Sequence, residues 1–527
     1  MNRTDRWRTG VLGIATVAMI GMLCPGARGL NPALDVSQYV HTAWKIRDGF
    51  TKGAITSIAQ TRDGYLWLGT EFGLLRFDGV RNVAWSPPDG QPLPDNNVQS
   101  LLAASDGTLW IGTTKGLASW KDGKLTQYPE LADQPVVALL EDHEGTIWAS
   151  SRAISLGNGK LCTIHSSQAK CFVQDMNVDF LYEDSRHNIW AAAANALWRC
   201  NPAPLERYPM PDPIMQTPQT MAEDEKGALL IATRNGIKRF VNGKTELYLL
   251  PGIRRDIKSD KLFRDRQGSL WIGTFGGGLF HLHQGRTDAF SQADGLSGND
   301  PWGVFEDREG TIWVVTDGGL DRFRDFTVPT FSVKQGLPSS VAWSVLAAKD
   351  GSIWIGSPNG LAHWKEKQFT IYQKPGARAV SGDLGQRAGT VRRITDSGLP
   401  NGVAQSVAQD HKGRIWVTTS GGVAYFEKEQ FISIKDVPTG SAYSVIEDNA
   451  GDFWVNHNQG LLHLSGEKIV ETIPWTKLGH QGIAVTLAAD RLQGGIWLGF
   501  FNGGLAYLRD GQVRASYSAA DGLGKGH

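Results

Sequence analysis

Short apolar runs alternate with polar turn residues along most of the chain, and the same order of runs recurs. Within residues 98–128, turn dipeptides such as Asp106-Gly107 and Asp122-Gly123 separate four runs of strand-like character. Asp-Gly between two alternating apolar runs is the strongest short signal for a β-hairpin. Long runs with a helical period of 3.6 residues are absent from the sequence. The pattern therefore predicts an all-β chain built from four-stranded units.

One tryptophan position marks each unit and repeats about every 41 residues. Four strands in about 40 residues make one blade of a β-propeller. Three residues before this anchor stands a glycine in every copy but one, where His187 replaces it, which predicts a tight turn with positive φ. We expect these repeated residues to be structural, and function to lie in residues that break the repeat. The eleven anchor positions are Trp67, Trp110, Trp148, Trp190, Leu230, Trp271, Trp313, Trp354, Trp416, Trp454 and Trp497.

The recurring pattern Asp-x-x-Gly-x-Leu/Ile-Trp-Ile/Leu-Gly-Thr-x-x-Gly-Leu resembles the two-component regulator propeller repeat. Signals such as Asp294-Gly295-Leu296 and Gln335-Gly336-Leu337-Pro338 precede it, and the resemblance runs from about residue 38 to the end. The resemblance implies the periplasmic sensor region of a phosphorelay receptor, commonly two seven-bladed propellers followed by a β-sandwich, a membrane helix and a histidine kinase. Because the sequence stops at His527, inside what looks like a twelfth copy, we expect a truncated receptor.

The spacing predicts three parts: a signal peptide (1–29), a first propeller of about seven blades (30–330), and an incomplete second propeller of four blades plus the start of a fifth (331–527). Three arginines precede the apolar run 11–23, and Ala27-Arg28-Gly29 offers a cleavage site. An uncleaved anchor or a lipoprotein at Cys24 are the alternatives. We expect a periplasmic or extracytoplasmic location, with membrane attachment only if the natural chain continues. Residues 40–46 could supply the outer strand that closes the first ring.

Charge and cysteine content refine this interpretation. The chain has 53 basic and 53 acidic residues, so its net charge of zero argues against nucleic-acid binding. Export permits disulfides, and Cys162 and Cys171 could bridge a hairpin while Cys200 stays unpaired. A Gly-rich, basic insertion near residues 373–393 is interpreted as a surface loop, or alternatively as a docking loop for a partner or an acidic ligand.

Ligand binding is expected at the turns between the second and third strands, because loops on a rigid scaffold carry function. The phenylalanines there could stack on a sugar ring, and the polar side chains could hydrogen-bond its hydroxyls. The expected ligand is a small molecule or an oligosaccharide. The alternative is that these turns are exposed and bind nothing. The candidate residues are Glu71, Phe72, Lys115, Arg234, Asn235, Phe275 and Asp317.

Catalytic signals are weak. No nucleophile elbow or zinc-protease motif occurs, and His281 and His283, two residues apart on one strand, suggest a structural pair rather than a zinc site. We therefore expect no metal, no cofactor and no catalytic residue. The predicted function is ligand sensing in two-component signal transduction, with a homodimer through the sensor region as an expected partner. A free-standing secreted carbohydrate-binding propeller and a propeller lyase are the alternatives.

Overall fold

The computed structural model describes residues 29–523, except 88–89, 153–158, 166–167, 175–176, 194–195, 202–203, 210–219, 254–256, 326–329, 367, 374–390 and 480–481. Nearly all of the predicted signal peptide and most of the insertion near 373–393 lie outside the described residues. The chain divides into two compact units, Met1–Pro329 and Thr330–His527. No helix in the described part of the chain has the length and apolar character needed to span a membrane.

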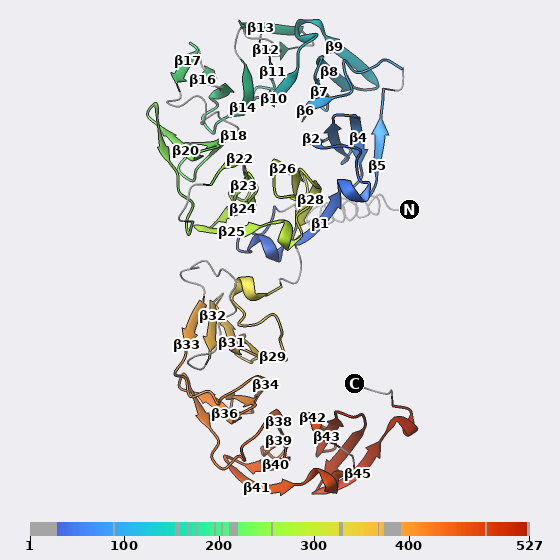
Figure 1. Ribbon diagram of the computed structural model, residues 1–527, viewed down its shortest axis with the longest axis vertical. Coiled ribbons are helices and arrows are strands. Elements are labelled where there is room, and N and C mark those ends of the chain that lie inside the picture. Colours follow the sequence, from blue (N-terminus) through green and yellow to red (C-terminus); the bar gives the residue numbers. More distant parts are fainter. Residues whose placement is uncertain are drawn as a thin grey trace, which may run out of the picture. The chain divides into compact units, whose positions relative to one another are not determined.

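The first unit is a β-propeller. Its described residues form seven four-stranded antiparallel sheets, which lie in a ring with the first strand of each sheet toward the centre (Figure 1). Six sheets take four consecutive strands each: β2 (Ile55–Gln60), β3 (Leu66–Thr70), β4 (Gly73–Phe77), β5 (Asn82–Trp85); β6 (Val98–Ala103), β7 (Leu109–Thr113), β8 (Gly116–Lys121), β9 (Lys124–Tyr128); β10 (Val136–Glu141), β11 (Ile147–Ser151), β12 (Lys160–His165), β13 (Gln168–Gln174); β14 (Val178–Glu183), β15 (Ile189–Ala193), β16 (Ala196–Asn201), β17 (Glu206–Pro209); β18 (Thr220–Glu223), β19 (Leu229–Thr233), β20 (Gly236–Val241), β21 (Lys244–Leu247); β22 (Ser259–Arg264), β23 (Leu270–Thr274), β24 (Gly278–His283) and β25 (Arg286–Phe290).

The seventh sheet joins the two ends of this unit. Its strands are β26 (Pro301–Glu306), β27 (Ile312–Thr316), β28 (Gly319–Arg324) and the N-terminal strand β1 (Val40–Lys45). β1 pairs antiparallel with β28, so the prediction that residues 40–46 supply the outer strand is confirmed. Trp44 of β1 stacks on Trp313 of β27 with ring centroids 5.6 Å apart. This pairing joins the first and last strands of the unit in one sheet and so closes the ring.

The second unit, considered alone, contains four sheets in its described residues. The first has a fifth strand, β33, which pairs in parallel with β32 after the insertion. The strands are β29 (Ser344–Ala347), β30 (Ile353–Ser357), β31 (Gly360–Lys365), β32 (Gln368–Tyr372), β33 (Val391–Ile394); β34 (Ala404–Gln409), β35 (Ile415–Thr419), β36 (Gly422–Glu427), β37 (Gln430–Ser433); β38 (Ala442–Glu447), β39 (Phe453–His457), β40 (Gly460–Ser465), β41 (Lys468–Ile473); β42 (Ala484–Ala489), β43 (Ile496–Phe500), β44 (Leu505–Arg509) and β45 (Gln512–Tyr517).

Short 3-10 helices lie between sheets or next to the terminal strands in both units. They are η1 (Val36–Gln38), η2 (Ile46–Asp48), η3 (Pro129–Leu131), η4 (Gln292–Asp294), η5 (Val333–Gln335), η6 (Trp475–Leu478) and η7 (Ala519–Asp521). The described residues are thus almost entirely strand and turn, which confirms the all-β propeller prediction.

The anchor tryptophans pack between neighbouring sheets, as the sequence predicts. Trp271 of β23 is fully buried in a cluster with Ile312 and Phe323 of the next sheet. Its indole Nε1 donates a hydrogen bond to Asp265 Oδ2 at 2.8 Å, and Asp265 Oδ1 accepts from the backbone N–H of Ser269 at 2.8 Å. The aspartate of the repeat therefore fixes both the hairpin turn and the tryptophan. The same indole–aspartate bond occurs for Trp148, Trp190, Trp313, Trp416 and Trp454.

A disulfide joins β12 to β13, between Cys162 and Cys171, and the described residues leave Cys200 as a free, buried thiol. Burial raises the pKa of the Cys200 thiol to about 12, so this side chain stays protonated and unreactive. The cysteine pairing that the sequence left open is thereby assigned.

Candidate ligand-binding face

The turns between the second and third strands of each sheet lie beside the start of the first strand, at one end of the blades. Backbone hydrogen bonds hold them there: Thr114 N donates to Asn97 O at 3.0 Å, and Phe275 N donates to Lys258 O at 3.1 Å. We call this end of the first propeller, made of these turns and the beginnings of the first strands, the turn face. All seven candidate residues lie in its turns and are exposed: Glu71, Phe72, Lys115, Arg234, Asn235, Phe275 and Asp317.

A buried threonine fixes the backbone of these turns. Thr70 Oγ1 accepts a hydrogen bond from Phe72 N at 3.1 Å and donates to Gly73 O at 2.8 Å. Thr233 makes the same two bonds with Asn235 N and Gly236 O, at 3.2 and 2.6 Å. The Gly-Thr of the repeat thus serves the turn, and it presents the two variable residues after it to solvent.

Three of the candidate turns are linked through neighbouring sheets. The guanidinium carbon of Arg234 lies 5.6 Å from the ring centroid of Phe275 in the next blade. Asp300 connects the turn that contains Phe275 to the turn that contains Asp317. Its carboxylate accepts a hydrogen bond from Gly276 N, and its own N–H donates to Asp317 Oδ1 at 3.3 Å. Arg234, Phe275 and Asp317 therefore form one continuous arc, which we call the Arg234–Asp317 arc. Asn235 shares the turn of Arg234.

The other three candidates lie apart from this arc. The side chains of Glu71 and Phe72 fold over Gly53, where an added Cβ would come within 2.5 Å of Glu71 Oε1 and 2.6 Å of the Phe72 ring. Lys115 Nζ forms an ion pair with Asp95 Oδ2 at 3.2 Å. No contact between described residues joins these three side chains to the Arg234–Asp317 arc, so the structure brings only part of the predicted set together.

Lys261 is a candidate that the sequence analysis missed. This half-buried residue of β22 has its Nζ 5.1 Å from the ring centroid of Phe180 in β14, and burial lowers its pKa to about 8. The described residues place no carboxylate within ion-pair distance of its Nζ. The same position in other blades holds Ser57, Ser100, Ala138, Phe180 or Gly303. A lysine among these uncharged residues is the signal that could have revealed it.

Acidic and aromatic groups also belong to the turn face. Burial raises the pKa of Asp260, Asp300 adds to this shift, and Arg234 opposes it. Trp302 of β26 is 38% exposed and donates through Nε1 to Ile55 O at 2.9 Å. The turn face thus offers an unpaired cation, exposed aromatic rings, carboxylates and a guanidinium, which are the groups that bind sugars and acidic small molecules.

The histidine pair expected to be structural lies away from this face. His281 and His283 stack in β24 with centroids 4.4 Å apart and are buried. His283 Nε2 lies 2.6 Å from Asp288 Oδ2, and its Nδ1 lies 2.7 Å from Pro32 O. Burial opposes protonation of His283, but the contacts with Asp288 and Asp35 outweigh it and raise the pKa to about 9. The pair therefore ties the segment before β1 to β24 and β25.

Comparison with known proteins identifies the same repeat. The family model described as two component regulator propeller matches residues 49–72, 92–115, 295–318 and 398–421. No curated protein sequence matches the chain. A solved extracellular domain assigned to a hybrid two-component system of B. thetaiotaomicron is 18% identical with a TM-score of 0.62, over 93% of this chain and 68% of that one.

Two further solved structures are more distant. Another extracellular domain assigned to a hybrid two-component system of B. thetaiotaomicron is 18% identical with a TM-score of 0.44, over 91% of this chain and 67% of that one. Virginiamycin B lyase from Staphylococcus aureus is 15% identical with a TM-score of 0.44, over 55% of this chain and 100% of that one. The first neighbour establishes the shared fold.

Proposed function

The chain carries two-component regulator propeller repeats, and on this basis we propose that it is the extracytoplasmic sensor region of a signal-transduction receptor. The proposed ligand site is the turn face of the first propeller. Binding there changes signalling only if the ligand binds the signalling state more tightly than the resting state. The homodimer expected from the sequence stays a prediction.

The unpaired charge of Lys261 carries the proposal for the ligand class. A half-buried ammonium group without a carboxylate partner is destabilised by loss of water, as its lowered pKa indicates, and an anionic ligand would supply the missing charge. The exposed ring of Phe275, 56% accessible beside Arg234, supplies a face on which a sugar can stack. These groups favour an oligosaccharide that bears an acidic group.

Calorimetric titration of the full chain with matched neutral and acidic oligosaccharides tests this function. We expect binding of an acidic member of the panel, and at least tenfold weaker binding by Lys261→Met and by Phe275→Ala, since loss of one charged or stacking contact is worth about 1.4 kcal/mol or more. Phe501→Ala is the matched control, because Phe501 is an equally exposed turn phenylalanine in the second unit. Equal affinities in wild type, Lys261→Met and Phe275→Ala would refute the proposed site.

A further inference from the structure

A carboxylate link connects neighbouring blades at the end opposite the turn face. The residue after the repeat aspartate donates its backbone N–H to a glutamate at the end of the first strand of the next blade. Ser185 N donates to Glu223 Oε2 at 2.9 Å, and Arg266 N donates to Glu306 Oε2 at 2.8 Å. Because this glutamate bridges two blades, any ligand bound to it would also bridge them.

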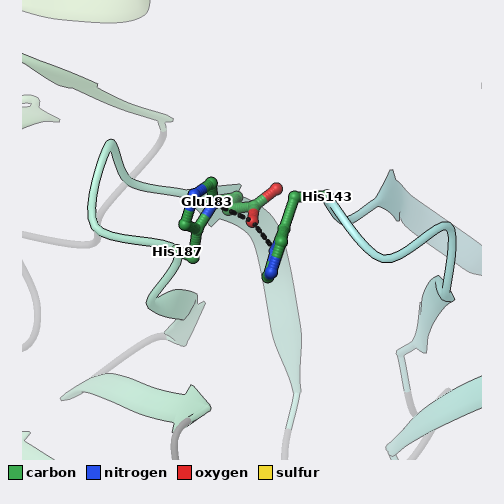
Figure 2. A group of neighbouring side chains, drawn as sticks. All are labelled: His143, Glu183 and His187. Carbon is green, nitrogen blue, oxygen red and sulfur yellow. Dashed lines mark hydrogen bonds and ion pairs between the residues drawn. The ribbon is translucent and has the colours of Figure 1, made fainter.

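At the junction between β10–β13 and β14–β17, two histidines join this glutamate. His143 follows the repeat aspartate in the turn before β11, Glu183 ends β14, and His187 lies in the turn before β15. Glu183 Oε1 lies 2.6 Å from His143 Nδ1 and 3.0 Å from His187 Nδ1 (Figure 2). The two imidazole rings stack with centroids 3.9 Å apart.

His187 occupies its position against the preference of the backbone. Its φ is +64°, in the left-handed region, where the other ten copies of the repeat have glycine. A non-glycine residue in this region costs about 1 kcal/mol or more. A cation bound between the two rings and the carboxylate would offset this cost through its binding free energy.

We propose that His143, Glu183 and His187 bind a divalent transition-metal ion of the zinc type. One ligand atom from each residue lies within 4.8 Å of the others. Zinc takes imidazole nitrogen at about 2.0–2.1 Å and carboxylate oxygen at about 2.0–2.2 Å, so tetrahedral ligand atoms stand about 3.3 Å apart. The observed separations need only small side-chain rotations to reach this geometry. Three protein ligands leave a fourth position for water.

Exposure and charge allow an ion to enter this site. The side chains of His143 and His187 are 38% and 58% exposed, whereas Glu183 is 16% exposed and holds its carboxylate in place. The second group with ligand chemistry among the described residues, His281, His283 and Asp288, is buried, and His283 already contacts Pro32 O and Asp288 with its two ring nitrogens. The exposed junction is therefore the better metal site.

The second unit contains the same link without the second histidine. His411 N donates to Glu447 Oε2 at 2.8 Å, and His411 Nδ1 contacts Glu447 Oε1. The position equivalent to His187 is Gly451, with φ of +86°, and a Cβ there would lie 3.7 Å from His411 Cε1. This pair is a built-in control: it should not retain the ion, and Gly451→His should convert it into a second site.

The test measures bound zinc in tag-free full chain after removal and controlled return of the metal. We expect one Zn²⁺ for each wild-type chain, loss of that ion in His187→Gly, and two ions in Gly451→His. Cobalt substitution should give the visible absorption of a tetrahedral site in the wild type and lose it in His187→Gly. Because glycine suits the left-handed φ, His187→Gly should melt no lower than wild type without metal, yet gain nothing from zinc. Equal zinc content or equal zinc stabilisation in wild type and His187→Gly would overturn the proposal.

Discussion

The bond between Trp271 and Asp265 provides a direct test of how the repeat holds its blades. In Asp265→Ala the indole N–H, fully buried, loses its acceptor. An unsatisfied buried donor costs about 1–3 kcal/mol. The backbone N–H groups of Gln267 and Ser269 also lose their bonds to Asp265 Oδ1, of 3.0 and 2.8 Å, at about 0.5–1.5 kcal/mol each. We expect a loss of about 3 kcal/mol in the free energy of unfolding of the first unit.

Urea unfolding of the full chain, combined with hydrogen exchange of the peptide 265–274, measures this loss where it arises. About 3 kcal/mol corresponds to exchange that is faster by about 100-fold. Glu225→Ala is the control, since Glu225 is an exposed residue in the equivalent turn of another blade and should change stability by less than about 0.5 kcal/mol. If Asp265→Ala were as close to wild type as this control, the reasoning would be wrong.

The second blade offers the reciprocal change. Ala104 stands where other copies have the aspartate, and the buried Nε1 of Trp110 has no hydrogen-bond partner. Ala104→Asp should supply the acceptor and stabilise the first unit by about 1 kcal/mol. The carboxylate is expected to fit, because Asp265 and Asp307 are 6% and 5% exposed at the same position. If the Ala104→Asp variant were less stable than the wild type, an indole–aspartate bond would not stabilise this blade as it does the others.

Three further predictions concern titration and cross-linking. His283 has a pKa of about 9 against an ordinary 6.5, so its contacts with Asp288 and Asp35 together should contribute about 3 kcal/mol to the free energy of unfolding. This contribution should be fully present below pH 6.5 and lost as the pH rises through about 9. Urea unfolding at pH 6, 8 and 10 measures it, and a flat profile contradicts it. The Cys162–Cys171 bond closes a separation of nine residues, so its reduction should lower the free energy of unfolding by about 3 kcal/mol. Thermal melts with and without reductant measure this loss. Reductant should not change the melt of the variant in which both cysteines are alanine. Affinity for an acidic oligosaccharide should fall as the pH rises through about 8, where Lys261 loses its proton, and titrations of Lys261→Met should show no such fall.

The sequence predicts those features that are decided within one copy of the repeat. The glycine before each anchor has positive φ, as at Gly64 and Gly268, because the hairpin turn requires it locally. The closing strand is also predictable, since an apolar run precedes the first complete copy. In contrast, the parallel pairing of β33 with β32 depends on where the chain returns after an insertion, and nothing in Val391–Ile394 specifies that partner.

In the candidate sites, too, the sequence predicts what one copy of the repeat decides and does not predict contacts between copies. Turn positions such as Arg234 and Phe275 follow from the Gly-Thr-x-x-Gly pattern, but their proximity to each other depends on the angle between blades. Lys261 is near Phe180 only because the ring brings β14 and β22 toward the same centre. The metal-ligand group could not be predicted either, since His143 and Glu183 belong to different copies, although His187 was visible as a break in the repeat.

Two departures from the repeat in the first propeller are unfavourable to the unliganded fold. Lys261 keeps an unpaired charge half-buried near one end of the blades, and His187 keeps a left-handed backbone at the other. A ligand present at 100 times its Kd stabilises the folded state by about 2.7 kcal/mol, which exceeds the roughly 1 kcal/mol that a left-handed non-glycine residue costs. Binding can therefore offset each departure, whereas nothing in the repeat itself does. Because one ring carries both positions, a ligand at either end stabilises the same folded unit. The free energy of unfolding of the wild type should therefore exceed that of His187→Gly only when the metal is supplied.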